Sequence, residues 1–229
     1  MIETNIKKVQ ERIKQACERS GRSVSEITLI AVSKTKPFEM IQEAYTAGMR
    51  EFGENKPQEL RDKARQCQVP IRWHMIGTLQ SNKIKYVVGT ACCIHSVDSV
   101  SLAAAIEKEA KKQETKIDIL LEVNIAKEPS KHGFLEEEVL PAVIEIAKMP
   151  HLCVRGLMTV APYTENAEEN RIYFKKMKQL LIDISSKNID NIIMDVLSMG
   201  MSSDYEVAIE EGSTMVRIGT KIFGERVYP

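Results

Sequence analysis

Short apolar segments alternate with helix-like segments along almost the whole chain. The first, residues 27–32, is a largely apolar, β-branched run that is typical of a strand buried on both faces. Seven further strand candidates follow at 50–53, 72–77, 92–97, 117–124, 152–158, 192–198 and 214–219. Because a helix-like segment separates each strand from the next, we expect parallel strands joined by helical crossovers.

Eight such units predict one α/β domain over residues 1–229, a (β/α)8 barrel of the TIM type. Its helices are expected at 37–48, from 57 onward, and at 82–88, 100–112, 136–148, 167–186 and 205–210. An extra helix at 2–20 has apolar residues spaced by three and four, so residues 1–21 should pack on the barrel. The alternative is an open sheet, if edge strands have been overcounted.

Composition narrows the class of protein. The 32 basic and 32 acidic residues give a formal net charge of +0, so we expect neither nucleic acid nor a membrane as partner. The 5 cysteines show no Cys-x-x-Cys spacing, and the 4 histidines show no metal-binding spacing. The N-terminus lacks the apolar core of a signal peptide. We therefore expect a cytoplasmic protein with reduced thiols and no metal site.

A lysine follows the first strand candidate at the position where barrels place functional groups. Such groups gather at the C-terminal ends of the strands, and Lys34 comes directly after the run that ends at Ser33. Partial burial lowers the pKa of a lysine and favours the neutral amine that forms a Schiff base. The alternative is a solvated lysine at a strand end. Lys36, next to Pro37, is expected at the surface.

Two segments near the C-terminus have the character of a phosphate site. The loop at 198–204 and the pair Gly219–Thr220 follow the last two strand candidates, where these barrels commonly bind phosphate. Ordinary turn chemistry, with Ser202 as a helix N-cap, is the alternative. Arg217 lies inside an apolar strand and needs an anion or acceptor, or else a salt bridge to Asp195 or Glu122.

These segments together resemble one protein family. The matching stretches are AVSKTKP at 31–37, FGEN at 52–55, HMIGTLQSNK at 74–83, LEVN at 121–124, GLM at 156–158, LSMGMS at 197–202 and VRIGTKIFG at 216–224. In combination they are similar to the pyridoxal phosphate homeostasis proteins, whose barrel resembles the N-terminal domain of alanine racemase. The resemblance implies the type III fold of proteins that bind pyridoxal 5′-phosphate (PLP).

The resemblance also implies a role for each matching residue. It implies a Schiff base between PLP and Lys34, and an arginine, Arg217, facing the pyridine nitrogen. Ser198, Gly219 and Thr220 would help to hold the phosphate, and Asn55 and Met199 would lie near the ring; Lys56 and Pro57 depart from the family pattern beside Asn55.

Arginine can only donate hydrogen bonds, so a ring nitrogen that faces Arg217 stays unprotonated and PLP becomes a weaker electron sink. The chain ends at Pro229, soon after the eighth unit, so we expect no second β-rich domain and no dedicated catalytic activity. The resemblance thus implies a monomeric PLP carrier in vitamin B6 and amino-acid homeostasis. Its partners would be PLP, other B6 vitamers and apo-enzymes that receive PLP. A weak amino-acid racemase and a cofactor-free Schiff-base aldolase are the alternatives.

Overall fold

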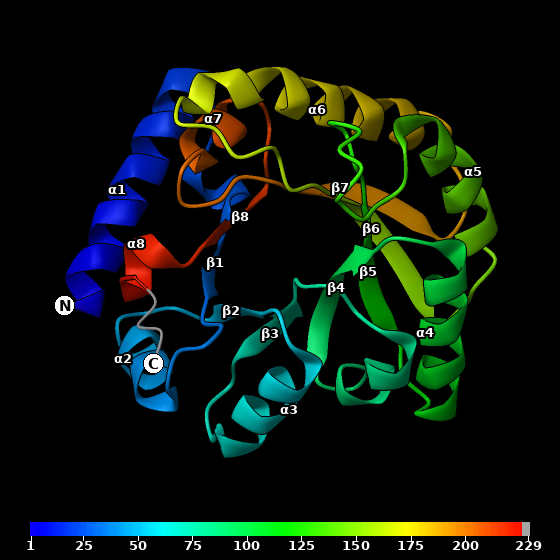
Figure 1. Ribbon diagram of the computed structural model, residues 1–229, viewed down its shortest axis with the longest axis horizontal. Helices are drawn as coiled ribbons and strands as arrows, with labels where there is room; N and C mark the ends of the chain where they lie inside the picture. Colours follow the sequence, from blue (N-terminus) through cyan, green and yellow to red (C-terminus); the bar gives the residue numbers. More distant parts are fainter. Residues whose placement is uncertain (226–229) are drawn as a thin grey trace.

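The computed structural model describes residues 1–225, which form a closed barrel of eight parallel strands in sequence order (Figure 1). The barrel confirms the predicted fold class over an open sheet. Each strand is short and mostly buried, as expected when helices cover the barrel from outside. The strands are β1 (Thr28–Val32), β2 (Glu51–Glu54), β3 (Arg72–Met75), β4 (Ala91–Val97), β5 (Ile117–Glu122), β6 (Leu152–Met158), β7 (Ile192–Ser198) and β8 (Met215–Ile218).

Helices form a ring around the strands. They are α1 (Ile2–Ser20), α2 (Phe38–Thr46), α3 (Pro57–Gln66), α4 (Val100–Lys112), α5 (Glu136–Ile146), α6 (Arg171–Ser185), α7 (Tyr205–Glu210) and α8 (Thr220–Phe223), with the 3-10 helices η1 (Val24–Glu26), η2 (Ser81–Tyr86) and η3 (Ala167–Asn170). The extra N-terminal helix α1 buries one face against α2, α7 and α8 (Figure 1). Gly21 ends it in a left-handed conformation, φ 67°, that glycine adopts without strain.

Two local predictions differ from the structure. The segment expected as a helix at 82–88 is the 3-10 helix η2, in which the Lys83 amide donates to the Gln80 carbonyl three residues earlier. Short 3-10 helices are common as connectors, and η2 lies in the connection between β3 and β4. The short helix α8 directly follows β8 and was not expected from the pattern.

The core has two parts, because side chains in a strand point alternately to either face. The larger part lies between the strands and the surrounding helices. A small apolar group, formed by Cys93, Leu120, Met158 and Val196, packs separately from it. Within residues 1–225, no helix combines the length and the apolar character needed to cross a membrane.

Candidate functional site

A cleft of about 630 Å³ opens at the C-terminal ends of the strands. It brings together residues from both ends of the chain, because β8 pairs with β1 to close the barrel. Its lining residues are Val32, Lys34, Lys36, Asn55, Ile76, Val160, Tyr163, Met201, Ser202, Ser203, Arg217, Gly219, Thr220 and Gly224. Five of the seven residues predicted from the sequence are among them: Lys34, Asn55, Arg217, Gly219 and Thr220.

The half-buried Lys34 sits in a tight turn after β1. The Lys36 amide closes this turn by donating to the Ser33 carbonyl at 3.0 Å. Thr35, the next residue after the lysine, has φ 61°, a left-handed conformation that is uncommon outside glycine. Its amide donates to Glu59 Oε1 at 2.6 Å, which compensates for the unfavourable backbone conformation. The turn therefore holds Lys34 toward the cleft through contacts with α3.

The buried ion pair between Lys63 and Glu54 stabilises the same turn. Lys63 Nζ donates to the Ser33 carbonyl at 2.8 Å, to Glu54 Oε1 at 2.8 Å and to Glu59 Oε1 at 2.7 Å. The Ser33 hydroxyl also donates to Glu54 Oε1, at 2.6 Å. Glu54 is fully buried, and burial raises its pKa although Lys63 opposes the shift. This network fixes the end of β1 to β2 and α3.

Asn55 reaches the cleft because a glycine lies beside it. A Cβ at Gly77 would lie 2.5 Å from the Asn55 carbonyl oxygen and 2.7 Å from its Cα, so only glycine fits. The Ser96 hydroxyl donates a hydrogen bond to the Gly77 carbonyl at 2.6 Å. The ends of β2, β3 and β4 are thereby packed closely around Asn55.

The opposite wall is formed by the loop after β7. Gly200 has φ 92°, and a Cβ there would come within 2.6 Å of the Ala208 Cβ, so the loop packs directly on α7. Asp204 Oδ1 accepts from the Met201 amide at 2.7 Å, and Asp204, not Ser202, is the N-cap position of α7. Ser202 and Ser203 are thus left at the cleft wall beside Thr220.

Arg217 projects from β8 and is almost completely buried. Its Nη1 donates to Ser198 Oγ at 2.6 Å and its Nη2 to the Thr159 carbonyl at 2.8 Å. Burial lowers its pKa to about 10, so the guanidinium stays charged near neutral pH. Asp195, one of the partners considered from the sequence, is instead paired with Arg155 at 2.6 Å.

Ser198 and Met199 lie in the interior, fully buried, and are not part of the cleft wall in the described chain. The Ser198 hydroxyl is hydrogen-bonded to Arg217 and, at 3.0 Å, to His95 Nδ1. Strand alternation turns its side chain into the barrel, and its part in holding the phosphate stays a prediction. Ser202, in the loop that follows β7, lines the cleft.

Sequence reasoning misplaced one lining residue and missed another. Lys36 was expected at the surface, but it is half-buried and its Nζ donates to the carbonyls of Phe223, Gly224 and Glu225 at 3.2, 3.1 and 2.8 Å. It ties the turn after β1 to the end of α8, a contact across 187–189 positions that no local signal could reveal. Tyr163, with 90% of its surface exposed, stands at the rim of the cleft.

Neighbouring strands bring two histidines and two cysteines together below the cleft. His74, Cys93 and His95 form one group, and Glu51, His74 and Cys92 form another. Sequence spacing did not show this, because Glu51 and His74 come from other strands than the β4 residues. All four ring nitrogens have hydrogen-bond contacts: His74 Nδ1 with His95 Nε2, His74 Nε2 with Glu51, and His95 Nδ1 with Ser198. Since a metal would have to displace these contacts, we assign no metal here.

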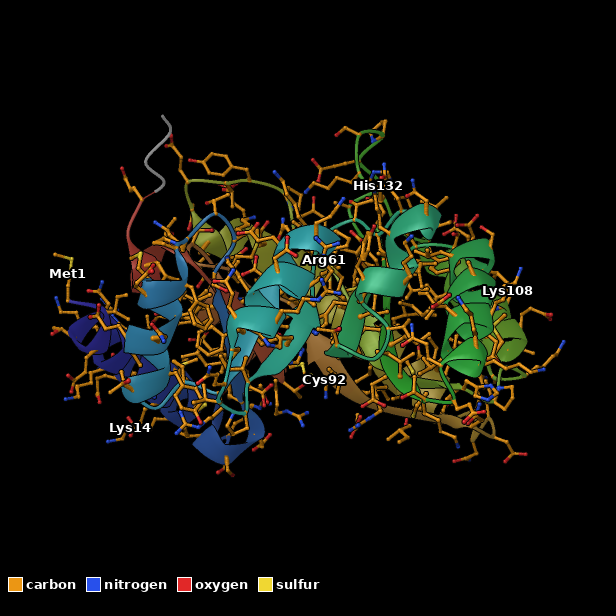
Figure 2. The ribbon with its side chains drawn as sticks, turned by 90° about the horizontal axis from the view of Figure 1, so that it is seen from below. Met1, Lys14, Arg61, Cys92, Lys108 and His132 are labelled. Carbon is orange, nitrogen blue, oxygen red and sulfur yellow. The ribbon has the colours of Figure 1, made fainter. Side chains whose placement is uncertain are left out.

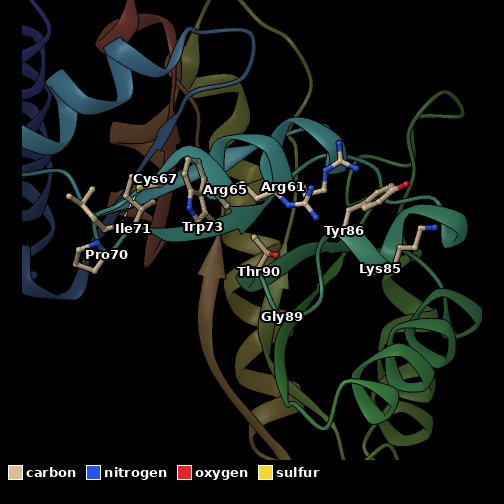
Figure 3. A pocket seen from close by; sticks show the side chains of 12 residues that line it. Arg61, Arg65, Cys67, Pro70, Ile71, Trp73, Lys85, Tyr86, Gly89 and Thr90 are labelled. Atoms are coloured by element: carbon tan, nitrogen blue, oxygen red, sulfur yellow. Dashed lines mark hydrogen bonds between the residues drawn. The ribbon is translucent and has the colours of Figure 1, made fainter.

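A second hollow, of about 440 Å³, lies on the outside of the barrel between α3 and η2 (Figure 3). Arg61, Arg65, Lys85 and Tyr86 line it, and the Arg61 guanidinium lies 4.6 Å from the centre of the Tyr86 ring. It shares no lining residue with the cleft that holds Lys34.

The barrel fold and the residues that line its cleft indicate a class of protein. The family model described as "Alanine racemase, N-terminal domain" matches residues 4–227. The alanine racemase of Clostridium difficile has the same fold, with a TM-score of 0.72 at 16% identity, over 99% of this chain and 56% of that chain. The protein is therefore a barrel of the alanine racemase N-terminal domain class.

Within this class, much more similar proteins share nearly the full length. A relative from Aquifex aeolicus, named "Pyridoxal phosphate homeostasis protein", is 45% identical over 225 residues, 97% of each chain. The structure of PipY from Synechococcus elongatus, with PLP bound, has a TM-score of 0.82 at 33% identity, over 94% of this chain and 100% of that chain. The chain belongs to the family of pyridoxal phosphate homeostasis proteins.

Proposed function

We propose that this protein binds PLP in the cleft and holds it covalently through the Lys34 amine, as a Schiff base. The observation that carries the proposal is that Lys34, from the first strand, and the Gly219–Thr220 turn, after the last, line the same cleft. An amine and a phosphate-binding turn in one cleft match the aldehyde and the phosphate of PLP. The PLP-bound PipY structure supports the same ligand.

The wall opposite Lys34 fits a phosphate group. Ser202, Ser203 and Thr220 offer hydroxyl donors there. The first N–H groups of a helical turn have no partner within the helix, so the Gly219–Thr220 turn, where α8 begins, adds backbone donors. We propose that this group of donors holds the phosphate, helped by Ser198 at the end of β7, and that Met199 lies near the ring.

Arg217 fits the pyridine nitrogen. Its guanidinium can only donate, so a ring nitrogen beside it would accept and remain unprotonated. Bound PLP supplies a carbonyl carbon for amines and an electron sink, and an unprotonated ring weakens the sink. Asn55 lines the cleft beside Lys34 and is proposed to contact the ring substituents. This arrangement favours holding PLP over driving carbanion chemistry.

The role that fits this site is PLP storage and delivery in vitamin B6 and amino-acid homeostasis, with residues 1–229 acting as one PLP-binding domain. The names of the full-length relatives support homeostasis. A weak amino-acid racemase is the second candidate, because the matched family model is a racemase domain. Racemisation of any amino acid that is lost in Lys34→Ala would favour it.

The test is a visible spectrum with added PLP, followed by borohydride reduction and peptide mass mapping. We expect a PLP adduct on Lys34, none in Lys34→Ala, and an unchanged adduct in the control Lys7→Ala, whose exposed side chain lies outside the cleft. No adduct, or an adduct on a different residue, would contradict the proposal.

A further inference from the structure

Five side chains form a hydrogen-bonded chain through the interior of the barrel. Arg217 Nη1 contacts Ser198 Oγ at 2.6 Å, Ser198 Oγ contacts His95 Nδ1 at 3.0 Å, His95 Nε2 contacts His74 Nδ1 at 2.9 Å, and His74 Nε2 contacts Glu51 Oε2 at 2.7 Å. Each hydrogen bond joins side chains of two strands, and the series runs from β8 through β7, β4 and β3 to β2. Every member except Glu51 is almost fully buried.

The two end members of this hydrogen-bonded series, Arg217 and Glu51, lie at opposite mouths of the barrel. Arg217 lines the cleft at the C-terminal ends of the strands, whereas Glu51 is the first residue of β2 and is half-buried at the other end, beside Arg72 at 2.8 Å. Figure 2 shows the barrel from the side: the loop with His132 projects at one end, and Cys92, close to the start of β4, lies toward the other.

The chemistry of the two ends sets the direction of every bond between them. A guanidinium can only donate and a carboxylate can only accept. His74 Nε2–H therefore donates to Glu51, and with its single ring proton used there, His74 Nδ1 accepts from His95 Nε2–H. His95 Nδ1 then accepts from the Ser198 hydroxyl, whose remaining lone pairs face Arg217. The low dielectric of the interior agrees with a neutral His95 ring, since burial lowers the pKa of His95 well below its ordinary value.

We propose that Ser198, His95, His74 and Glu51 are positioning residues that act as one directed relay to orient Arg217 in the cleft. The part of this proposal that concerns PLP rests on the proposed function above. Because the Ser198 hydroxyl donates its hydrogen bond to His95 Nδ1, Ser198 presents only lone pairs to the guanidinium. The Ser198 oxygen and the Thr159 carbonyl thereby hold two nitrogens of the Arg217 guanidinium, and these two bonds direct the guanidinium at the ligand.

The first test needs no ligand. Protein labelled with ¹⁵N-histidine is studied by two-bond ¹H–¹⁵N correlation NMR, which tells protonated from unprotonated ring nitrogens. We expect His74 and His95 both to be neutral and to carry the proton on Nε2. His74→Gln and His95→Asn assign the signals. A proton on Nδ1 of either ring, or a doubly protonated His74, would overturn the directed relay.

The second test uses two substitutions of His95 that a purely structural role would not distinguish. In His95→Asn, the side-chain oxygen can take the place of Nδ1 and accept from Ser198. His95→Gln places its amide near Nε2, so it keeps the contact to His74 and loses the acceptor for Ser198. Both remove the ring and one hydrogen bond.

We expect His95→Gln and Ser198→Ala to weaken PLP binding about tenfold, as for the loss of a hydrogen bond to a charged group, and to shift the visible band of bound PLP. His95→Asn should stay close to the wild-type protein in both measurements. Equal effects of the two His95 substitutions would refute the positioning role.

The two proposals can fail separately. If the wild-type protein takes up no PLP on Lys34, the proposed function fails, and the NMR result still decides the relay. If PLP binds at Lys34 but the His95 substitutions behave alike, the positioning role fails and PLP binding stands.

Discussion

Removing the Lys63 ammonium should destabilise the protein strongly, because it leaves the buried Glu54 carboxylate without its cation. In Lys63→Met, fully buried Glu54 keeps one hydrogen bond, from Ser33, and its Oε2 has no partner among the described residues. Breaking a buried ion pair from one side typically costs about 3–5 kcal/mol. For a chain of this size, that corresponds to a fall in Tm of roughly 6–20 °C.

The pH dependence of this loss gives a sharper test than its size. Burial already raises the pKa of Glu54, and the two contributions of Lys63 that lower it disappear in the variant. A carboxyl group whose folded pKa is raised contributes stability that is present at low pH and is lost as pH rises through that pKa. The free energy of unfolding of Lys63→Met should therefore fall further below wild type as pH is raised from 5 to 8.

The assay is urea unfolding followed by circular dichroism at several pH values. Lys7→Met is the matched control, because Lys7 also pairs with a glutamate four residues away but is 71% exposed, so it should change little. The double variant Glu54→Gln, Lys63→Met should recover much of the loss, since it removes the buried charge. A loss no larger than that of Lys7→Met, or one that shrinks as pH rises, would refute the reasoning.

Three further results are expected. Alkylation of the folded protein at pH 8 should label half-exposed Cys67 well before Cys93, whose pKa is raised well above its ordinary value by burial; equal labelling by mass spectrometry would contradict this. Gly77→Ala should cost about 1–3 kcal/mol in thermal unfolding because its methyl group would displace the Asn55 backbone, so an unchanged Tm would count against that packing. Lys36→Met loses three carbonyl contacts at the end of α8, and amide hydrogen exchange should become faster there and stay unchanged in α4.

The local sequence was enough to predict the barrel, and five of the seven predicted site residues line the cleft. Strand and helix periods along the chain reflect burial on one or both faces, and eight alternations leave few topologies other than the closed barrel observed. The position of Lys34 directly after a buried strand predicted its place at the cleft for the same reason. The segment at 82–88 was harder, since a single 3-10 turn and a short helix carry the same apolar spacing.

The sequence by itself determined which residue types stand at the strand ends, because alternation and chain direction are local properties. Only the tertiary structure decided which of them meet. Closure between β1 and β8 brings Lys34 and Arg217 into one cleft, and the closed barrel places Ser198 against His95 of β4 while Ser202 lines the cleft. The buried Lys63–Glu54 pair and the chain from Arg217 to Glu51 depend on side chains of different strands and helices. Their contacts follow from the register and curvature of the closed sheet, which no single segment encodes.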